Sequence, residues 1–324
     1  MNSRSTGLLA CVVALQAGTA LAEDYPTRPI TLIVPFAAGG PTDTLARLLG
    51  QSMSETLKKQ VIVENVVGAG GTIGATRAAK SKPDGYTLFL HHIGQSTAPT
   101  LYRKLEYDPV KDFDPVGEVA DVPMTIVAKK DFAPKDAKEL ISYLKANQDK
   151  VTLANAGLGA ASHLCGLLFM SAIQAQLTTV PYKGTGPAMN DLIGGQIDLL
   201  CDQTTNTLSH IKGGKIKVYA VTTKKRLASL PEVPTLQEAG LKDFEVLVWH
   251  GLYVPKGTPK PVIDKLVHAL QVALKDQNVK ARLAELNTEP ASPDRVKPEA
   301  LRKRLESEIA KWAPVIKKAG QYAD

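Results

Sequence analysis

Short apolar runs alternate with amphipathic stretches along most of the chain. Ile30–Val34 is apolar enough for a strand buried on both faces, and Pro35 ends it because proline cannot donate to a strand ladder. After Gly39-Gly40, large apolar side chains recur at helical spacing up to Leu57. The alternation continues, so we expect an α/β fold with parallel sheets covered by helices. The further predicted strands are Val61–Glu64, Tyr86–His91, Met124–Ala128, Val151–Asn155, Thr178–Tyr182, Ile197–Cys201, Ile216–Val221 and Val246–Val254.

Helical patterns fill most of the gaps between these strands, for example Leu164–Ile173 and Thr207–Lys212. The end of the chain is also predicted to be helical. Thr258-Pro259 reads as an N-cap followed by proline in the first helical position. Two apolar stripes then follow at helical spacing, namely Val262, Ile263, Leu266, Leu270 and Leu274, and later Leu301, Leu305, Ile309 and Trp312.

The first 22 residues have the pattern of a secretory signal peptide. Arg4 supplies the positive charge, Gly7–Ala20 is the apolar region, and Ala20-Leu21-Ala22 is a small-x-small cleavage site. We expect cleavage after Ala22 and an exported, periplasmic protein. The alternative is a lipoprotein signal ending at Cys11, but it would leave only about four apolar residues before the cleavage site, fewer than the usual region needs.

Length and charge narrow the class of protein. A chain of 324 residues with 44% hydrophobic residues can form two domains. The formal charge is +7, and removal of Arg4 with the signal leaves 7 − 1 = +6. Because there is no long basic run and only 5% of residues are aromatic, we expect no nucleic-acid binding. A mildly positive surface would instead attract acidic solutes.

Cysteine usage gives little sign of metal chemistry. Cys11 leaves with the signal, so Cys165 and Cys201 remain. A disulfide between them needs Cα atoms within about 7 Å, and a chain of this size does not need a staple, so we favour two buried free thiols. No CxxC or Cys/His metal spacing is present, and we expect no metal and no cofactor.

The loop at Gly39-Gly40 is a candidate anion site. It joins a buried strand to a helix that begins near Pro41, and Thr42 or Asp43 could cap that helix. A glycine-rich loop at a helix start exposes unpaired N–H groups and the positive end of the helix dipole. The alternative is an ordinary turn between a strand and a helix.

Two later glycine-rich loops have similar positions. Gly68–Gly74 lacks the dinucleotide fingerprint, because Ile73 stands where the third glycine is needed, and it contains no Walker lysine. It either borders a cleft or serves structure alone. Asn155–His163 follows a strand and opens a helix that Ser162 could cap. No nucleophile elbow is present, and an ordinary N-cap remains the alternative.

Polar residues also follow two other predicted strands. His91-His92 ends one strand and Gly94-Gln95-Ser96 comes next, so one histidine could line a site and the other be buried. Asp202–Asn206 is a polar run after another strand, which could bind a ligand or cap the next helix. Strand C-terminal ends meet at one crevice in α/β folds, so we expect these loops to converge.

Several motifs occur in one order along the mature chain. They are Val34-Pro35-Phe36-x-x-Gly39-Gly40-x-x-Asp43-x-x-Ala46-Arg47, Gly68-Ala69-Gly70-Gly71-x-x-Gly74, Pro83-Asp84-Gly85-Tyr86-Thr87, Ser162-His163-Leu164, Val180-Pro181-Tyr182-Lys183-Gly184, Pro187-Ala188, Asp191-Leu192-x-Gly194-Gly195, Pro234-Thr235-x-x-Glu238-Ala239-Gly240 and Trp249-x-Gly251-Leu252. With them the sequence resembles the periplasmic solute-binding proteins of tripartite tricarboxylate transporters, the Bordetella uptake gene (Bug) family.

The resemblance implies a class II periplasmic-binding-protein fold, with two α/β lobes around a ligand cleft and two chain crossings as a hinge. By this mapping lobe 1 holds residues 23–123 and 248–324, and lobe 2 holds residues 124–247. The crossings are expected near Val122–Thr125 and Glu245–Trp249.

The resemblance also implies a small carboxylate ligand, such as a di- or tricarboxylate, an acidic amino acid or an aromatic acid. One end would be held by the loop Phe36–Asp43 and the other by Gly157–His163. Ala160 stands where the family often has serine, so the ligand's identity does not transfer. Together with the strand-end arguments, the candidate ligand-binding residues are Phe36, Gly39, Gly40, Thr42, Asp43, His92, Gln95, Gly157, Gly159, Ala160, Ser162, His163, Thr185 and Asp202.

The expected function is therefore capture of a carboxylate, without turnover, for the membrane subunits of a tripartite transporter, by a monomer. Two alternatives remain. One is a ligand-dependent sensor that docks a membrane kinase, and the other is a secreted enzyme acting on a carboxylate. No metal array, nucleophile elbow or phosphate loop favours the enzyme.

Overall fold

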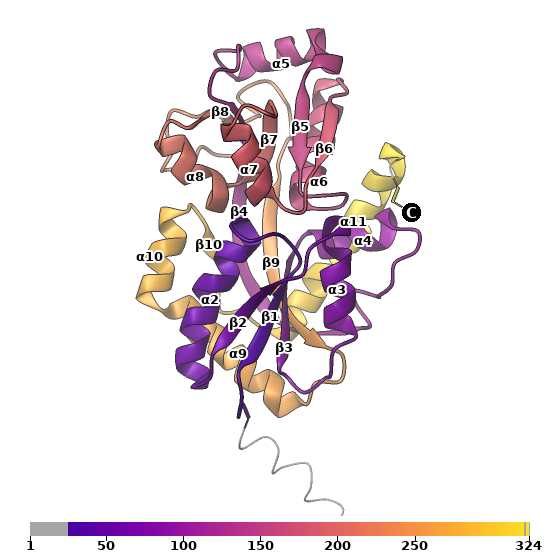
Figure 1. Ribbon diagram of the computed structural model, residues 1–324, viewed down its shortest axis with the longest axis vertical. Helices are drawn as coiled ribbons and strands as arrows, with labels where there is room; N and C mark the ends of the chain where they lie inside the picture. The colour runs from indigo at the N-terminus through magenta and orange to yellow at the C-terminus, as the bar shows by residue number, and fades with distance from the viewer. Residues whose placement is uncertain (1–24, 321, 324) are drawn as a thin grey trace, which may run out of the picture.

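The computed structural model describes residues 25–320, 322 and 323, and it contains two bodies joined by two long strands (Figure 1). The predicted signal peptide and its cleavage site lie outside the described residues. The two joining strands are β4 (Phe113–Lys129) and β9 (Leu247–Pro255), which run side by side through the middle of the molecule. None of the described helices is long and apolar enough to cross a membrane.

The larger body is the lower one in Figure 1 and contains both ends of the described chain. Its strands follow the order β2-β1-β3-β9-β4, and β10 pairs with β4. The other strands of this body are β1 (Ile30–Val34), β2 (Val61–Asn65), β3 (Thr87–His92) and β10 (Glu289–Pro290). Its helices are α2 (Pro41–Leu57), η2 (Ala69–Gly71), α3 (Thr72–Ala79), α4 (Gly94–Leu101), α9 (Lys260–Lys275), α10 (Gln277–Glu285) and α11 (Pro298–Ala319).

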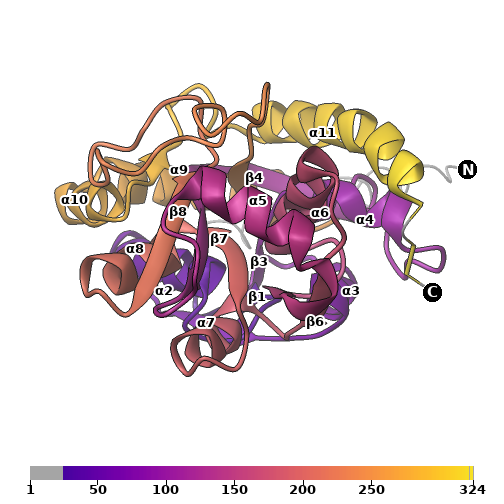
Figure 2. The same cartoon turned by 90° about the horizontal axis from the view of Figure 1, so that it is seen from above.

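The smaller body is built on the last part of β4. There β4 pairs with β7 and β8, and the order continues from β7 to β5 and β6. The strands are β5 (Thr152–Asn155), β6 (Thr178–Pro181), β7 (Leu199–Gln203) and β8 (Ile216–Val221). The helices are α5 (Ala137–Ala146), η3 (Gln148–Lys150), α6 (Ala161–Ile173), α7 (Thr185–Ile193) and α8 (Thr204–Lys212). Seen from above, α6 lies beside α11 of the larger body (Figure 2), and side chains of both helices line a groove of about 480 Å³.

The α/β fold class is confirmed, but the expectation of purely parallel sheets is wrong. β1 is parallel to β2 and β3, and β5 is parallel to β6 and β7. β9 is antiparallel to β3 and β4, and β4 is antiparallel to β7 and β8. The antiparallel pairs arise where β4 enters the smaller body and where β9 returns to the larger one.

The predicted strand at Met124–Ala128 is only the last third of β4. Its earlier part is interrupted in sequence by Pro115 and Gly117 and carries the charged residues Glu118 and Asp121. These carboxylates are nevertheless buried, because Arg295 of the 289–297 segment pairs with both of them. An ion cluster from distant sequence therefore permits charge within a buried strand, which periodicity alone does not reveal.

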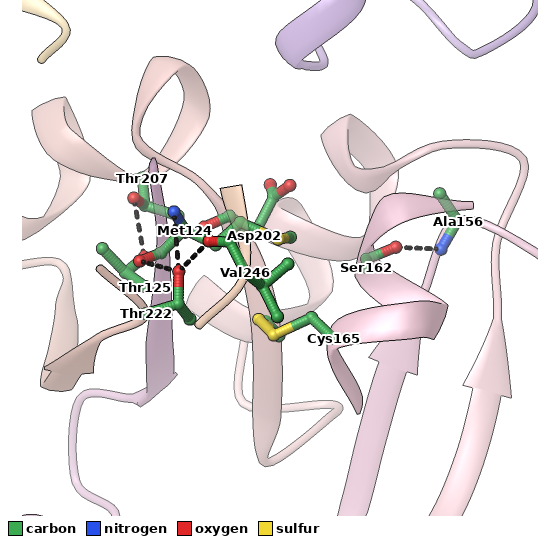
Figure 3. The surroundings of a disulfide bond; sticks show 10 residues. Met124, Thr125, Ala156, Ser162, Cys165, Asp202, Thr207, Thr222 and Val246 are labelled. Carbon is green, nitrogen blue, oxygen red and sulfur yellow. Dashed lines mark hydrogen bonds between the residues drawn. A yellow bond between two sulfur atoms is a disulfide. The ribbon is translucent and has the colours of Figure 1, made fainter. Parts of the chain in front are cut away.

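The joining strands are tied to each other where they leave the larger body. Val122 pairs with Val248 and Pro123 with Leu247. Next to them the Thr222 hydroxyl donates to the carbonyl of Val246 at 2.6 Å and lies 3.2 Å from the backbone of Met124 (Figure 3). One buried hydroxyl thus fastens both chain crossings at the same level.

The expectation of two free thiols is wrong, since Cys165 and Cys201 form a disulfide (Figure 3). Cys165 lies on α6 and Cys201 on β7, and their Cα atoms are 6.1 Å apart. α6 packs directly on β7, which brings the two positions within disulfide range although they are 36 residues apart in sequence. The bond fixes the first half of α6 to the sheet of the smaller body.

Candidate functional site

Helix starts from both bodies meet at the seam between them. α2 of the larger body contacts α8 of the smaller body. The loop before α2 also touches the loop before α7, because the Ala37 N–H donates to the Lys183 carbonyl at 2.9 Å. A Cβ built on Gly186 would lie 2.8 Å from the Ala38 carbonyl oxygen, so the two backbones approach as closely as glycine allows. The predicted convergence of the strand-end loops is therefore present.

The helices that begin at this seam lack side-chain caps. Their N-cap residues are Gly40 for α2, Ala160 for α6, Gly184 for α7 and Gln203 for α8, and none accepts through its side chain. By contrast, α5 and α10 begin elsewhere, and Asp136 and Asp276 cap them. α9 and α11 lie away from the seam and are also uncapped. The first N–H groups at the seam are thus available to an external acceptor, and the helix dipoles favour a negative one.

Asp43 supports the first loop from within. Its carboxylate accepts the Gly39 N–H at 2.9 Å and two bonds from Arg47 at 2.9 and 3.0 Å. Asn65 completes the support, since its amide nitrogen donates to both Asp43 and the Phe36 carbonyl at 2.9 Å. Asp43 is buried, and although burial alone would raise its pKa, the bonds from Arg47, Gly39 and Asn65 hold the pKa below its usual value. Neither Thr42 nor Asp43 caps α2 as the sequence suggested.

An aromatic cluster lies beneath this loop. Phe36 stacks on His92 with ring centres 4.7 Å apart, and His92 meets His250 edge to face at 5.8 Å. Thr42 Oγ1 lies 3.4 Å from His250 Nε2, which ties α2 to β9. Burial lowers the pKa of His92 to about 3 and that of His250 well below its usual value. Both rings are therefore neutral near pH 7 and add no charge to the site.

The second loop is supported by neutral groups. Ser162 Oγ accepts the Ala156 N–H at 2.8 Å (Figure 3), and Asn155 accepts the Gly157 N–H at 2.9 Å. His163 Nδ1 accepts the Gly159 N–H at 3.2 Å. The predicted cap at Ser162 is thus a brace inside the loop, and the helix begins after the fully buried Ala160.

The remaining candidates, Gln95, Thr185 and Asp202, are all buried. Gln95 is fully buried on α4, where its side-chain oxygen accepts from Tyr107 and its amide nitrogen has no partner among the described residues. Thr185 is buried at the start of α7, next to Gly40. Asp202 lies one residue before the end of β7, and its carboxylate accepts a hydrogen bond from Asn206 at 2.6 Å. Burial raises the pKa of Asp202 to about 6, against the lowering effect of its hydrogen bonds.

Two residues at the start of α8 were not selected from the sequence. Thr204 and Thr205 are buried, and the hydroxyls of both have no partner among the described residues. The side-chain oxygen of Gln203 also has no hydrogen-bond partner among the described residues. The signal was the polar run Asp202–Asn206, of which only Asp202 is among the candidate residues predicted from the sequence. Unpaired hydroxyls at an uncapped helix start can donate to an anion.

Cationic side chains are absent from three of the seam loops, whereas the loop before α7 contains Lys183. Positions 35–43, 155–162 and 202–206 contain no lysine, arginine or histidine. Within the described residues no group of three or more His, Cys, Asp or Glu side chains could hold a metal ion. The arrangement can therefore bind an anion through N–H and hydroxyl groups, but it offers no metal centre for chemistry.

Comparison with known proteins shows the family to which the chain belongs. Residues 45–321 match the model of the tripartite tricarboxylate transporter family receptor, TctC. The chain is 51% identical over 321 residues to the UPF0065 protein in the TAR-I ttuE-ttuC' intergenic region of Agrobacterium vitis, which covers 99% of this chain and 93% of that protein.

Two solved structures are similar over nearly the whole molecule. The periplasmic binding protein BugD has a TM-score of 0.91 and 54% sequence identity, covering 93% of this chain and all of that one. MatC from Rhodopseudomonas palustris with bound malate has a TM-score of 0.87 and 41% identity, covering 90% of this chain and all of that one. These neighbours are binding proteins with the periplasmic-binding-protein fold. The chain therefore belongs to the tripartite tricarboxylate transporter receptor family, within its Bug group, as the sequence motifs predicted.

Proposed function

We propose that the protein captures a small carboxylate at the seam between its two bodies and delivers it to the membrane subunits of a tripartite transporter. The observation that carries the proposal is the meeting of uncapped helix starts from both bodies, where the loops before α2, α6 and α8 contain no cationic side chain. N–H groups at helix starts suit carboxylate oxygens, and the unpaired hydroxyls of Thr204 and Thr205 add two donors. That a relative, MatC, binds malate supports the same ligand class.

The two bodies would act as the lobes of a clamp. The proposed boundaries are residues 23–123 with 248–324 for lobe 1 and residues 124–247 for lobe 2. A hydrogen bond to a charged group contributes about 1.5–3 kcal/mol, so neither loop alone gives tight binding. A ligand that engages both loops favours the closed arrangement, and the crossings fastened by Thr222 would serve as the hinge.

Export to the periplasm and binding without turnover complete the proposal. The apolar segment with its Ala20-Leu21-Ala22 site supports export. Burial lowers the pKa of His92 to about 3 and that of His250 well below its usual value, so both are weak proton acceptors. The Asp43 carboxylate is already bonded to Arg47, Gly39 and Asn65. We propose that the protein works as a monomer.

A binding panel tests this function. Thermal shift and calorimetry with malate, adipate, citrate and benzoate should reveal at least one stoichiometric ligand, and ligand at 100 times Kd should add about 2.7 kcal/mol to the free energy of unfolding. Analysis of the mixture by proton NMR should recover the ligand unchanged. If neutral sugars raise the melting temperature and no carboxylate does, the ligand class is wrong. If the carboxylate is consumed, the protein is an enzyme.

A further inference from the structure

One side chain spans the seam at its outer rim. The Tyr102 hydroxyl lies 2.7 Å from the Ala69 carbonyl oxygen of the larger body and 2.9 Å from the Leu158 carbonyl oxygen of the smaller body. Tyr102 itself follows α4 of the larger body. A phenol has one proton to donate, and here two carbonyls on opposite sides of the seam share it.

The backbone of Tyr102 is held firmly in this position. Its N–H donates to the Ala98 carbonyl at 3.0 Å, and it forms a strand-like bridge with Ala323 near the end of the chain. On both sides of that bridge, Ala323 exchanges backbone hydrogen bonds with Leu101 and Arg103, at 2.8 and 3.1 Å. The position of the hydroxyl is therefore fixed relative to the larger body, and its bond to Leu158 depends on the position of the smaller body.

The loops that Tyr102 joins are in direct contact. A Cβ built on Gly70 would lie only 1.8 Å from the Leu158 carbonyl oxygen, and one built on Gly157 would lie 2.9 Å from the Gly70 nitrogen. Thr97 Oγ1 adds a second bond across the seam, to the Gly159 carbonyl at 3.1 Å. These contacts join the two bodies directly and stabilise the closed arrangement.

Tyr102 also borders an open cavity of about 820 Å³ at the rim, whose walls come from both bodies. Tyr182 lines the same cavity, but its hydroxyl donates to Asp191 at 2.6 Å within the smaller body. The two tyrosines therefore share a surface and differ in one respect: only the Tyr102 hydroxyl bonds across the seam. Burial raises the pKa of Tyr102 to about 12, so the hydroxyl keeps its proton at neutral pH.

We propose that Tyr102 is a positioning residue of the clamp. Its hydroxyl joins the Ala69 and Leu158 carbonyls and keeps a fraction of the protein molecules in the closed arrangement before any ligand binds. This inference rests on the two-lobed clamp proposed above. The apparent affinity for a ligand increases with the fraction of molecules that are already closed. Tyr102 would therefore raise the affinity without touching the ligand.

Electron paramagnetic resonance distances between the lobes test the inference without ligand. Spin labels on Glu55→Cys and Lys145→Cys, both exposed and on opposite bodies, should give a short-distance population at the separation of these sites in the structure. Tyr102→Phe removes one shared neutral hydrogen bond, worth about 0.5–1.5 kcal/mol, so the closed-to-open ratio should fall about 2- to 10-fold. Tyr182→Phe loses a hydroxyl from the same cavity and should leave the ratio unchanged.

Gly70→Ala should abolish closure, since its methyl group would lie 1.8 Å from the Leu158 carbonyl oxygen and 2.7 Å from the Tyr102 hydroxyl, and so disrupts both contacts of the closed form. The short-distance population should disappear, while circular dichroism and the melting temperature show a folded protein. The inference is overturned if the wild type has no closed population, if Tyr102→Phe matches the wild type, or if Tyr182→Phe falls as far as Tyr102→Phe. Because no carboxylate is present, failure of the proposed ligand class would leave these results unaffected.

Discussion

The loops before α2 and α6 are both held in shape by side chains of the protein, but the chemistry of these side chains differs. In the larger body the loop before α2 is held by a carboxylate, with Arg47 and Asn65 around it. In the smaller body the loop before α6 is held by a hydroxyl, an amide oxygen and an imidazole, all neutral. The side chains that look most suitable for binding are thus used to shape the loops. What remains for a ligand at both loops is backbone N–H.

The buried aspartates show the same contrast. Asp43 has an arginine beside it, and its pKa is held below the usual value despite burial. Asp202 is buried in the smaller body with neutral partners only, and burial raises its pKa to about 6. One carboxylate therefore stabilises the folded state at neutral pH, whereas the other opposes it.

Asp43→Ala should have the largest effect on stability. It leaves the Gly39 N–H and the Asn65 amide without their acceptor, and we expect a loss of about 2–4 kcal/mol in the free energy of unfolding at pH 7. Because the folded-state pKa of Asp43 is lowered, its contribution is complete above the unfolded pKa near 4 and is lost as the pH falls through the folded value. Urea unfolding at pH 7 and pH 3 measures both effects.

The surface pair Lys260–Asp264 provides the control for Asp43. Asp264→Ala removes an exposed ion pair four residues apart on a helix and should cost less than about 1 kcal/mol. Equal losses for the two variants would mean that the bonds of Asp43 do not brace the loop.

Asp202→Asn should act in the opposite direction. A carboxyl whose folded-state pKa is raised binds its proton more tightly in the folded state, so its contribution to stability declines as the pH rises from about 4 to about 6. A rise of about two pKa units corresponds to on the order of 2–3 kcal/mol. The variant should thus gain stability relative to wild type between pH 4 and pH 7.5, as followed by urea unfolding. A difference that is constant with pH contradicts the raised pKa.

Ser162→Ala should cost about 1–2 kcal/mol, less than Asp43→Ala, because one neutral bond to the buried Ala156 N–H is lost. Ser142 is the matched control, since its hydroxyl bonds to a backbone carbonyl on an exposed helix face. Chemical denaturation of both alanine variants gives the comparison. A loss at Ser162 as large as at Asp43 would remove the distinction between the ionic and neutral loops.

Arg47→Ala should be the mildest change, at no more than about 1 kcal/mol. Its side chain is 55% exposed, so solvent replaces much of the ion pair with Asp43. The expected signature is an upward shift in the Asp43 pKa, which carboxyl NMR would detect. Abolished carboxylate binding in a folded Arg47→Ala protein would instead show that a salt bridge holds the ligand.

The positions of the seam loops could be predicted, but the use of their side chains could not. A buried strand, a glycine pair and an amphipathic helix are local patterns, so the order β1, loop, α2 is visible in the sequence. Whether Asp43 caps its own helix or braces the loop depends on Asn65, which follows 22 residues later. Ser162 raises the same ambiguity. From the sequence its hydroxyl could cap α6, but in the structure it accepts the Ala156 N–H of the preceding loop.

Long-range pairing explains the other differences. The disulfide depends on α6 lying over β7, and the charged part of β4 depends on Arg295. The sequence also does not show which glycines are required. Gly40 has a φ of −85°, and an added Cβ would make only ordinary contacts, so this position does not need glycine. Glycine is required instead at Gly39, whose φ is +79°, and at Gly184 and Gly186 of the facing loop, whose Cβ atoms would lie 2.8 Å from backbone atoms of the first loop.

The central claim is that helix-start N–H groups hold the carboxylate. Amide NMR of deuterated, ¹⁵N-labelled protein tests it most directly, with whichever carboxylate of the panel binds. We predict the largest shifts at the first amides of the seam helices α2, α6 and α8, among them Thr42, Asp43, Ala161 and Thr205, with matching slow hydrogen exchange. Shifts confined to lysine and arginine side chains, with these amides unchanged, would contradict the account.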